Sequence, residues 1–182
     1  MVMEDKLLIW KLRRGSREAL RRTYDKYHTD LLKLAVVLTG GMNAAEDVVQ
    51  DVFTQFAQSS RHLALAGSLR NYLITSTLNS VRNLRRYRGR HETRSLAEAD
   101  SLPSTENRPD QWAVMSEQLE HLAAAMAILP YEQREVITLR IEADLTLRKI
   151  AQLQKTSIST VQGRYRYGME KLRSLLNGEI QE

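Results

Sequence analysis

The sequence of 182 residues has no cysteine, 3 prolines and 8 glycines. Without cysteine, disulfides, thiol catalysis and cysteine-ligated zinc are excluded, and a cytoplasmic setting is favoured. No apolar run approaches the ~18 residues that span a bilayer, and the N-terminal stretch does not have the pattern of a signal peptide. The chain is rich in Leu, Ala, Arg and Glu, which favours helices. We therefore expect a helical protein without membrane insertion.

Positive charge is concentrated in two separate segments. The formal net charge is +5, and residues 61–95 carry 8 Lys/Arg against 1 Asp/Glu. Residues 146–182 carry 7 against 3, whereas residues 96–145 between them carry 3 against 10. Two basic blocks favour two contacts with a polyanion, because each neutralised phosphate releases counterions. The simpler alternative is a solvated basic surface.

Helical spacing of apolar residues organises the first half of the chain. A short helix ends at Gly15, and Ser16 is placed to cap a helix over 17–39, which Gly40-Gly41 ends. We expect the next helix to be capped by Asn43, with an apolar face opposite an acidic and polar one. After a loop over 59–68, Ser68 is placed to cap a helix over 69–86, whose outer face carries several arginines.

The periodicity disappears from about Gly89 to Asp110, which predicts a linker. Beyond it we expect helices over 112–129, with Leu122 on its buried stripe, and over 131–142, with Pro130 suited to the first turn. Thr146 is placed to cap a helix over 147–154. The predicted fold is all-α, with domains over 1–88 and 112–182 joined by a flexible linker over 89–111.

The stretch "STVQGRYRYG", residues 159–168, fits either a strand by alternation or a helix by angle. At 100° per residue, Val161, Tyr165 and Gly168 share one face that continues to Leu176, so we expect a helix over 158–176. Gly168 then lies inward, where a missing side chain permits close helix packing. Together with the helix before it, this segment predicts a helix-turn-helix whose second helix reads DNA with Ser159, Gln162 and Arg166.

Three stretches together resemble one known family. "GSREALRRTYDKYHTDLLKLAVVLTGGMNAAEDVVQDVFTQFAQ", "LRNYLITSTLNSVRNLRR" and "LPYEQREVITLRIEADLTLRKIAQLQKTSISTVQGRYRYGMEKLRSLL" resemble, in order, the bacterial RNA polymerase sigma factors of the extracytoplasmic-function group. The resemblance covers nearly the whole chain except the linker. It implies a non-enzymatic subunit, without cofactor or metal, that directs core polymerase to promoters and assists their melting.

The resemblance also implies roles for individual residues. Docking on the clamp coiled coil of core RNA polymerase falls to Asp47, Gln50, Asp51 and Thr54. Recognition of the minus-ten element in melted DNA, by base capture in the 59–68 loop and by phosphate contacts, falls to Arg61, His62, Asn79, Arg82, Arg85 and Arg86. Recognition of the minus-thirty-five element in double-stranded DNA falls to Lys155, Ser157, Ser159, Thr160, Gln162, Gly163, Arg164 and Arg166. An anti-sigma protein is a possible further partner.

The sequence departs from the usual family pattern at several of these places. Tyr72 stands where Trp is usual, Asn83 where Asp is usual, and Gln162-Gly163 where Lys-Ser is frequent. Lys155 stands where the turn usually has Gly, and a left-handed conformation there strains a lysine by about 1 kcal/mol. The promoter sequence is therefore not transferable from relatives.

Two other classes of function compete with this interpretation. A two-domain DNA-binding regulator explains residues 146–182 but gives no role to the polar face after Asn43 or to the arginine-rich helix. An enzyme has little support, because the four histidines are scattered without ligand spacing and no phosphate-binding glycine loop occurs.

Overall fold

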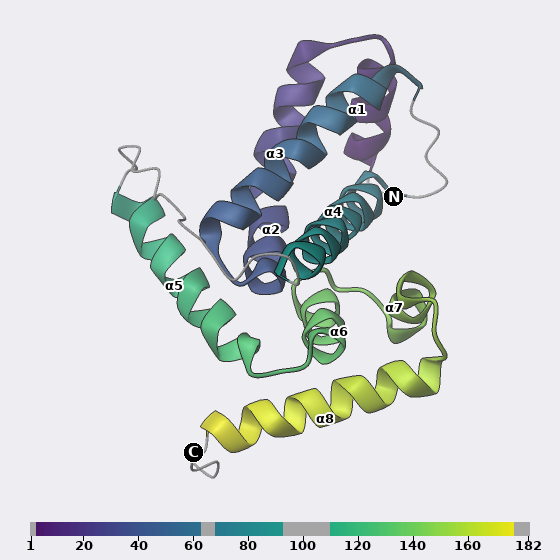
Figure 1. Ribbon diagram of the computed structural model, residues 1–182. Helices are drawn as coiled ribbons and strands as arrows, with labels where there is room; N and C mark the ends of the chain where they lie inside the picture. The colour runs from purple at the N-terminus through teal and green to yellow at the C-terminus, as the bar shows by residue number, and fades with distance from the viewer. Residues whose placement is uncertain (1–2, 63–67, 93–109, 177–182) are drawn as a thin grey trace. The chain divides into compact units, whose positions relative to one another are not determined.

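The computed structural model describes residues 3–62, 68–92 and 110–176. These residues form α-helices and one short 3-10 helix, and no strand occurs among them, which confirms the predicted all-α class (Figure 1). The elements are α1 Met3–Arg13, α2 Arg17–Thr39, α3 Met42–Ser59, η1 Ser60–His62, α4 Leu69–Glu92, α5 Asp110–Ala127, α6 Tyr131–Ile141, α7 Leu147–Gln154 and α8 Ile158–Leu176.

The chain divides into two compact units, one built from most of α1 to α4 and the other containing α5 to α8. Each unit has its own set of buried apolar side chains. The domain limits that the sequence suggested, with a linker over 89–111, remain a prediction, because most of that segment lies outside the described residues. Within it, α4 continues to Glu92 and α5 begins at Asp110.

The core of the first unit follows the periodic stripes of α2, α3 and α4. Its largest fully buried side chains include Leu31 and Leu34 of α2, Phe56 of α3, and Leu69 and Leu73 of α4. Burial of each such side chain contributes about 1.5–3 kcal/mol, so these stripes supply the main attraction between the helices.

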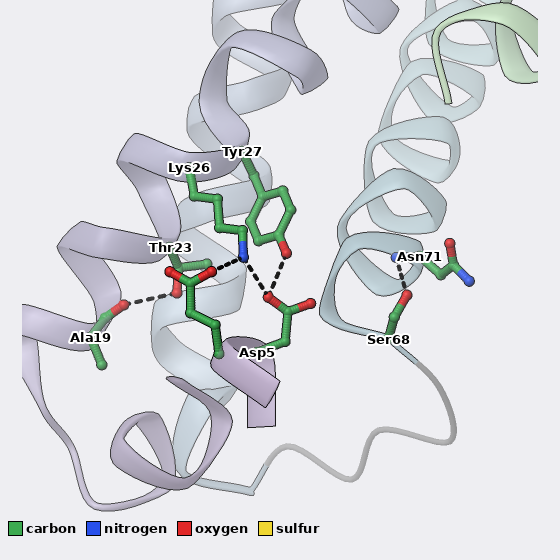
Figure 2. Close-up of polar contacts among 8 residues, drawn as sticks. Asp5, Ala19, Thr23, Lys26, Tyr27, Ser68 and Asn71 are labelled. Carbon is green, nitrogen blue, oxygen red and sulfur yellow. Dashed lines mark hydrogen bonds and ion pairs between the residues drawn. The ribbon is translucent and has the colours of Figure 1, made fainter. Parts of the chain in front are cut away.

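Two of the predicted helix caps of this unit are confirmed. The Ala19 amide donates to Ser16 Oγ at 3.2 Å. The Asn71 amide donates to Ser68 Oγ at 3.1 Å, as Figure 2 shows. Between α1 and α2, Gly15 has a φ of +77°, and its amide and that of Ser16 return to carbonyls at the end of α1. These bonds end α1 and start α2 within three residues.

A buried carboxylate joins α1 to α2. Asp5 is only 3% exposed, and its Oδ1 accepts from Lys26 Nζ at 2.9 Å and from the Tyr27 hydroxyl at 2.8 Å (Figure 2). Lys26 also donates to the exposed Glu4 at 2.7 Å. Burial and the bond to Asp5 raise the pKa of Tyr27 to about 12, and the bonds to Glu4 and Asp5 raise the pKa of Lys26. The joint is therefore stable while Lys26 is charged and Tyr27 is neutral.

Three sequence predictions need correction. The helix expected to start after Asn43 begins at Met42, so Asn43 lies inside the first turn of α3. α4 does not end at residue 86 but runs to Glu92, because arginines have good helix propensity even where no apolar stripe guides the packing. Leu122, expected on the buried stripe of α5, is 41% exposed, whereas Ala123 beside it is fully buried.

The second unit contains the predicted helix-turn-helix. Thr146 caps α7 by accepting from the Lys149 amide, as expected, and Pro130 occupies the N-cap of α6 rather than its first helical position. Met126, Leu129 and Ile137 form a buried cluster. Side chains of α8, namely Tyr165, Met169 and Leu172, pack against this cluster.

Gly168 lets α8 approach α6 closely, as its inward position predicted. A Cβ atom at Gly168 would lie 2.7 Å from Ile137 Cδ1 and 3.3 Å from Gln133 Cβ. The first distance is shorter than a real Cβ contact, so the buried Ile137 side chain would have to move to admit a Cβ at this position. The stretch that alternated like a strand is thus a helix, with Val161 fully buried on its inner face.

Candidate functional site

The exposed face of α3 presents acidic and polar groups. Val49, Val52 and Phe56 bury the opposite face of this helix against the unit's core. The candidates for polymerase docking all have exposed side chains: Asp47, Gln50, Asp51 and Thr54. A rigid helix anchored along one side can present such groups to a basic partner without local ordering on binding.

An aromatic cluster lies between α2 and α3. The Tyr24 ring lies 4.6 Å from the His28 ring and 4.8 Å from the Phe53 ring, measured between centroids. Burial lowers the pKa of His28, and burial together with Asp25 and Glu46 raises the pKa of Tyr24. Both shifts favour the neutral forms, so the acids of α3 are not neutralised by a histidine cation here.

The candidates for the minus-ten element come from η1 and α4. Arg61 and His62 are exposed in η1, and the Arg61 guanidinium lies against the turn between α1 and α2, because a Cβ at Gly15 would be 3.3 Å from Arg61 Nε. The rest of the loop over 63–67 lies outside the described residues. The remaining candidates of this set lie on the outer side of α4, where Arg82 is half-buried and the other three are exposed: Asn79, Arg82, Arg85 and Arg86.

The additional length of α4 extends this basic stripe. Arg90 follows Arg86 by one turn and donates from Nε to the Arg86 carbonyl at 3.3 Å. Arg86 also donates to Oδ1 of Asn83, the residue that stands where the family usually has Asp. Arg88 and Tyr87 are exposed on the same two turns. Apolar periodicity did not predict this extension, because Leu84 is the last apolar residue of the stripe on α4.

The N-terminus of α8 carries a cluster of hydroxyl groups. Ser157 Oγ accepts from the Thr160 amide at 3.0 Å and lies 2.8 Å from both Ser159 Oγ and Thr160 Oγ1. All three residues are exposed, at the end of a 19-residue helix where backbone amides and the helix dipole favour negative charge. Lys155 just before them is exposed and left-handed, with φ 52° and ψ 45°. The strain expected for this lysine is therefore present.

Further along α8, the outer face is polar and open. Gln162 and Arg166 are exposed, and Arg166 donates to the Tyr167 hydroxyl at 3.1 Å. A Cβ at Gly163 would meet only Tyr167 Cε2, at 3.9 Å, so protein packing does not require a glycine there. Tyr167, which was not among the residues expected to contact DNA, lies on the same face, is 56% exposed and contacts Arg166.

Arg164 differs from the other candidates in this helix. It is half-buried, and its Nη1 donates to Gln154 Oε1 at 2.7 Å. Gln154 in turn donates from Nε2 to Glu135 Oε1 at 3.0 Å. The structure thus places Arg164 at the joint between α7 and α8, apart from the open face formed by Gln162 and Arg166.

The described ranges contain neither a candidate metal site nor a candidate membrane-spanning helix. Within them, no group of three His, Asp or Glu side chains is arranged to hold a metal ion. None of the helices in the same ranges is both long and apolar enough to cross a membrane.

Comparison with known proteins assigns the two units. Residues 23–91 match the family model "Sigma-70 region 2", and residues 125–174 match "Sigma-70, region 4". The chain belongs to the sigma-70 family. It is 24% identical over 172 residues to the ECF RNA polymerase sigma factor SigX of Bacillus subtilis, a match that covers 91% of this chain and 89% of SigX. The sigma factor is thus one of the extracytoplasmic-function group, as the sequence predicted.

Two solved structures share its fold. CnrH, solved in complex with the cytosolic domain of CnrY, matches with a TM-score of 0.69 at 21% identity over 97% of this chain and 99% of that one. The sigma factor RpoE, solved with the anti-sigma factor NepR from Bartonella quintana, matches with a TM-score of 0.64 at 24% identity over 86% and 98%. Region 2 of the sigma factor therefore contains α3 and most of α4, and region 4 contains the helix-turn-helix.

Proposed function

We propose that this sigma factor recruits core RNA polymerase to specific promoters, assists their melting, and is not itself an enzyme. The observation that carries the proposal is the order of region 2 and region 4 on two helical units, each with an exposed polar face suited to a different partner. In this proposal the domains keep the limits expected from the sequence, and the protein acts in the cytoplasm, where core polymerase and DNA meet.

The polymerase contact is assigned to the α3 face. Asp47, Gln50, Asp51 and Thr54 are exposed along a helix whose other side is fully packed. The clamp coiled coil is the expected partner, and a basic helix there would complement these acids. No base-reading role suits this face, because acidic side chains repel phosphates.

Contact with melted DNA is assigned to η1 and α4. Arg82, Arg85 and Arg86 supply charge for the non-template strand, and Asn79 lies one turn before them with Arg61 and His62 in η1. Capture of an extruded base costs a few kcal/mol, which phosphate contacts along a rigid basic helix can offset. Melting assistance follows from this preference for single-stranded DNA.

Contact with the duplex upstream is assigned to the start of α8. The hydroxyls of Ser157, Ser159 and Thr160 can donate to phosphate oxygens, and the helix N-terminus favours the same negative charge. Gln162 and Arg166 are placed to reach base edges in the major groove, with Lys155 beside the backbone and Gly163 allowing close approach. Arg164 supports this surface from the joint behind it.

An anti-sigma protein is a proposed further partner. The related RpoE was solved with the anti-sigma factor NepR, and CnrH with the cytosolic domain of CnrY. A regulator of this kind would have to cover at least one of the faces described above. Competition between such a protein and core polymerase for the α3 face would reveal it.

Run-off transcription tests the proposal. Purified core polymerase is given a genomic template pool with and without the full chain, and promoter-specific transcripts are expected only with it. The absence of such transcripts, together with no binding to core polymerase, would contradict the proposal. If the chain bound DNA specifically but not the polymerase, the result would instead favour a two-domain DNA-binding regulator.

A double substitution tests the polymerase contact within this framework. Gln50→Ala with Asp51→Ala should weaken binding to core polymerase about tenfold or more, because truncating a polar side chain at the centre of an interface costs about 1–3 kcal/mol. DNA binding by region 4 should be unchanged. Asp25→Ala, an exposed acid on α2, is the matched control and should keep full affinity. Equal core affinity in the double variant would remove the α3 assignment.

A further inference from the structure

A single amide joins α6 to both helices of the helix-turn-helix, α7 and α8. Gln154 is the last residue of α7, and its Nε2 donates to Glu135 Oε1 at 3.0 Å and to the Glu132 carbonyl at 3.3 Å, both on α6. Its Oε1 accepts from Arg164 Nη1 on α8 at 2.7 Å. Both ends of the side chain are therefore bonded, each to a different helix.

The charges of Glu135 and Arg164 determine which way the Gln154 amide is turned. Glu135 is 1% exposed, and a buried carboxylate is stable only where donors reach it. An amide can donate to a carboxylate with its nitrogen and accept from a guanidinium with its oxygen, which matches the two charged neighbours of Gln154. Reversal of the amide would place its oxygen against the carboxylate and its nitrogen against the guanidinium. The orientation of Gln154 is thus determined by the charges on both sides.

The position of Gln154 makes this connection relevant to DNA reading. Lys155 follows it in the left-handed turn, and the exposed hydroxyls of Ser157, Ser159 and Thr160 come next. Arg164 lies one to two turns into α8, beside Gln162 and Gly163 in sequence. The amide therefore ties the start of the reading helix to the scaffold helix α6 through one residue before the turn and one residue after it.

We propose that Gln154 is a positioning residue that sets the angle of α8 through Arg164, and thereby the base preference of region 4. The inference rests on the proposed promoter-reading function. In it, Arg164 acts from within the protein, whereas Gln162 and Arg166 act on the DNA. A shift of about 1 Å in a reading helix is enough to misalign bidentate contacts, which require both hydrogen bonds at normal length.

Transcription from a randomised promoter library tests the proposal. Holoenzyme formed from core polymerase and the full chain transcribes barcoded templates whose minus-thirty-five segment is randomised, and the transcripts are sequenced. Gln154→Met keeps the volume of the side chain but removes both of its polar ends. We expect the preference for the best base over the others to fall about fivefold in that segment, the scale of one weakened base contact, with the minus-ten preference unchanged.

Two comparisons separate positioning from mere stability. Gln152→Met is the matched control, because Gln152 is an exposed glutamine on the same helix, and it should keep the wild-type preference. Loss of folded protein lowers all transcripts together but leaves the ratio between templates unchanged. Arg164→Met should reduce the preference as Gln154→Met does, and the double variant should be no worse than either single one. Arg164→Met also keeps the test decisive if Gln154→Met does not fold.

The outcomes are distinguishable. An unchanged base preference in Gln154→Met would overturn the positioning role while leaving the sigma function intact, and so would effects of the two substitutions that simply multiply. If the wild-type chain gave no promoter-specific transcript at all, the proposed function would fail and this inference with it.

Discussion

Both units contain a buried carboxylate at a helix joint, but the two carboxylates reach their cationic partners differently. Asp5 in the first unit contacts Lys26 and Tyr27 directly and connects two helices. Glu135 in the second unit is connected to Arg164 through the amide of Gln154, which connects three helices. A direct ion pair stabilises the contact between two helices. A neutral amide between a carboxylate and a guanidinium links a third helix without burying another charge.

The largest expected effect comes from removing the direct partner. Asp5→Ala leaves the Tyr27 hydroxyl without its acceptor and Lys26 with only the exposed Glu4. Asp5 is buried but Lys26 is 30% exposed, so the loss of both hydrogen bonds to the carboxylate should lower the free energy of unfolding by about 2–3 kcal/mol. Urea unfolding followed by fluorescence of Trp10, which lies on α1, would measure it.

Glu4→Ala is the control for that experiment. Glu4 binds the same lysine at 2.7 Å, but its side chain is 62% exposed, so water replaces it with a loss of less than about 1 kcal/mol. Comparable losses in both variants would show that burial of Asp5 does not determine the strength of the joint, and the contrast between the two units would disappear.

The next effect is a dependence on alkaline pH that only the first joint should show. The folded-state pKa of Tyr27 is about 12, above its ordinary value of 10.0, so the folded state retains a proton that the unfolded state releases. The contribution of Tyr27 is therefore complete below about pH 10 and is lost as the pH rises towards 12. The slope is at most about 1.4 kcal/mol per pH unit.

Tyr27→Phe should flatten this slope between pH 10 and 11 in urea unfolding. The raised pKa of Lys26 acts in the same direction, so the variant should keep the remaining part of the slope. A slope identical to that of the wild type would show that the phenol of Tyr27 titrates freely in the folded protein.

The smallest effects compare two glycines of α8. Gly168→Ala places a Cβ 2.7 Å from Ile137 Cδ1 and should destabilise region 4 by about 1 kcal/mol, because the cost of overpacking exceeds the gain in helix propensity. Gly163→Ala meets no such contact and should stabilise it by up to about 1 kcal/mol. Thermal unfolding of the two variants would give opposite shifts, whereas equal shifts would contradict the packing role of Gly168.

Gly163→Ala also tests DNA binding. If Gly163 permits close approach of DNA, the more stable variant should bind promoter DNA more weakly. Unchanged promoter affinity would make Gly163 an ordinary surface residue, and the departure from the usual Lys-Ser pair would have no functional meaning.

Apolar periodicity predicted most of the fold because it reports which side of a helix is buried. It gave the helix over 158–176 and the inward Gly168, and short-range cap chemistry gave Ser16, Ser68 and Thr146. It failed at the end of α4, where arginine propensity continues a helix without an apolar stripe. It also misplaced Leu122, since a stripe alone does not show whether the large residue or its small neighbour faces the core.

The polar joints could not be predicted in the same way. Asp5 and Glu135 lie where acids are ordinary on helix surfaces, and nothing local distinguishes a buried carboxylate from an exposed one. Gln154 carries no periodic signal, and its partners lie 19 residues before it and 10 after it in the chain. The open faces of α3 and α8 were expected from helical spacing, and their assignment to polymerase and promoter DNA, which follows the family resemblance, stays a prediction.

Because α4 is one continuous helix, it holds its arginines at fixed distances from one another. Steps of four residues advance about 6 Å along a helix, so Arg82, Arg86 and Arg90 stand at fixed intervals that no DNA strand can adjust. One inserted residue before Arg86 would rotate Arg86 and Arg90 by about 100° relative to Arg82 while leaving the composition nearly unchanged. Binding of melted DNA would then depend on the direction in which the arginines project from the helix rather than on their number.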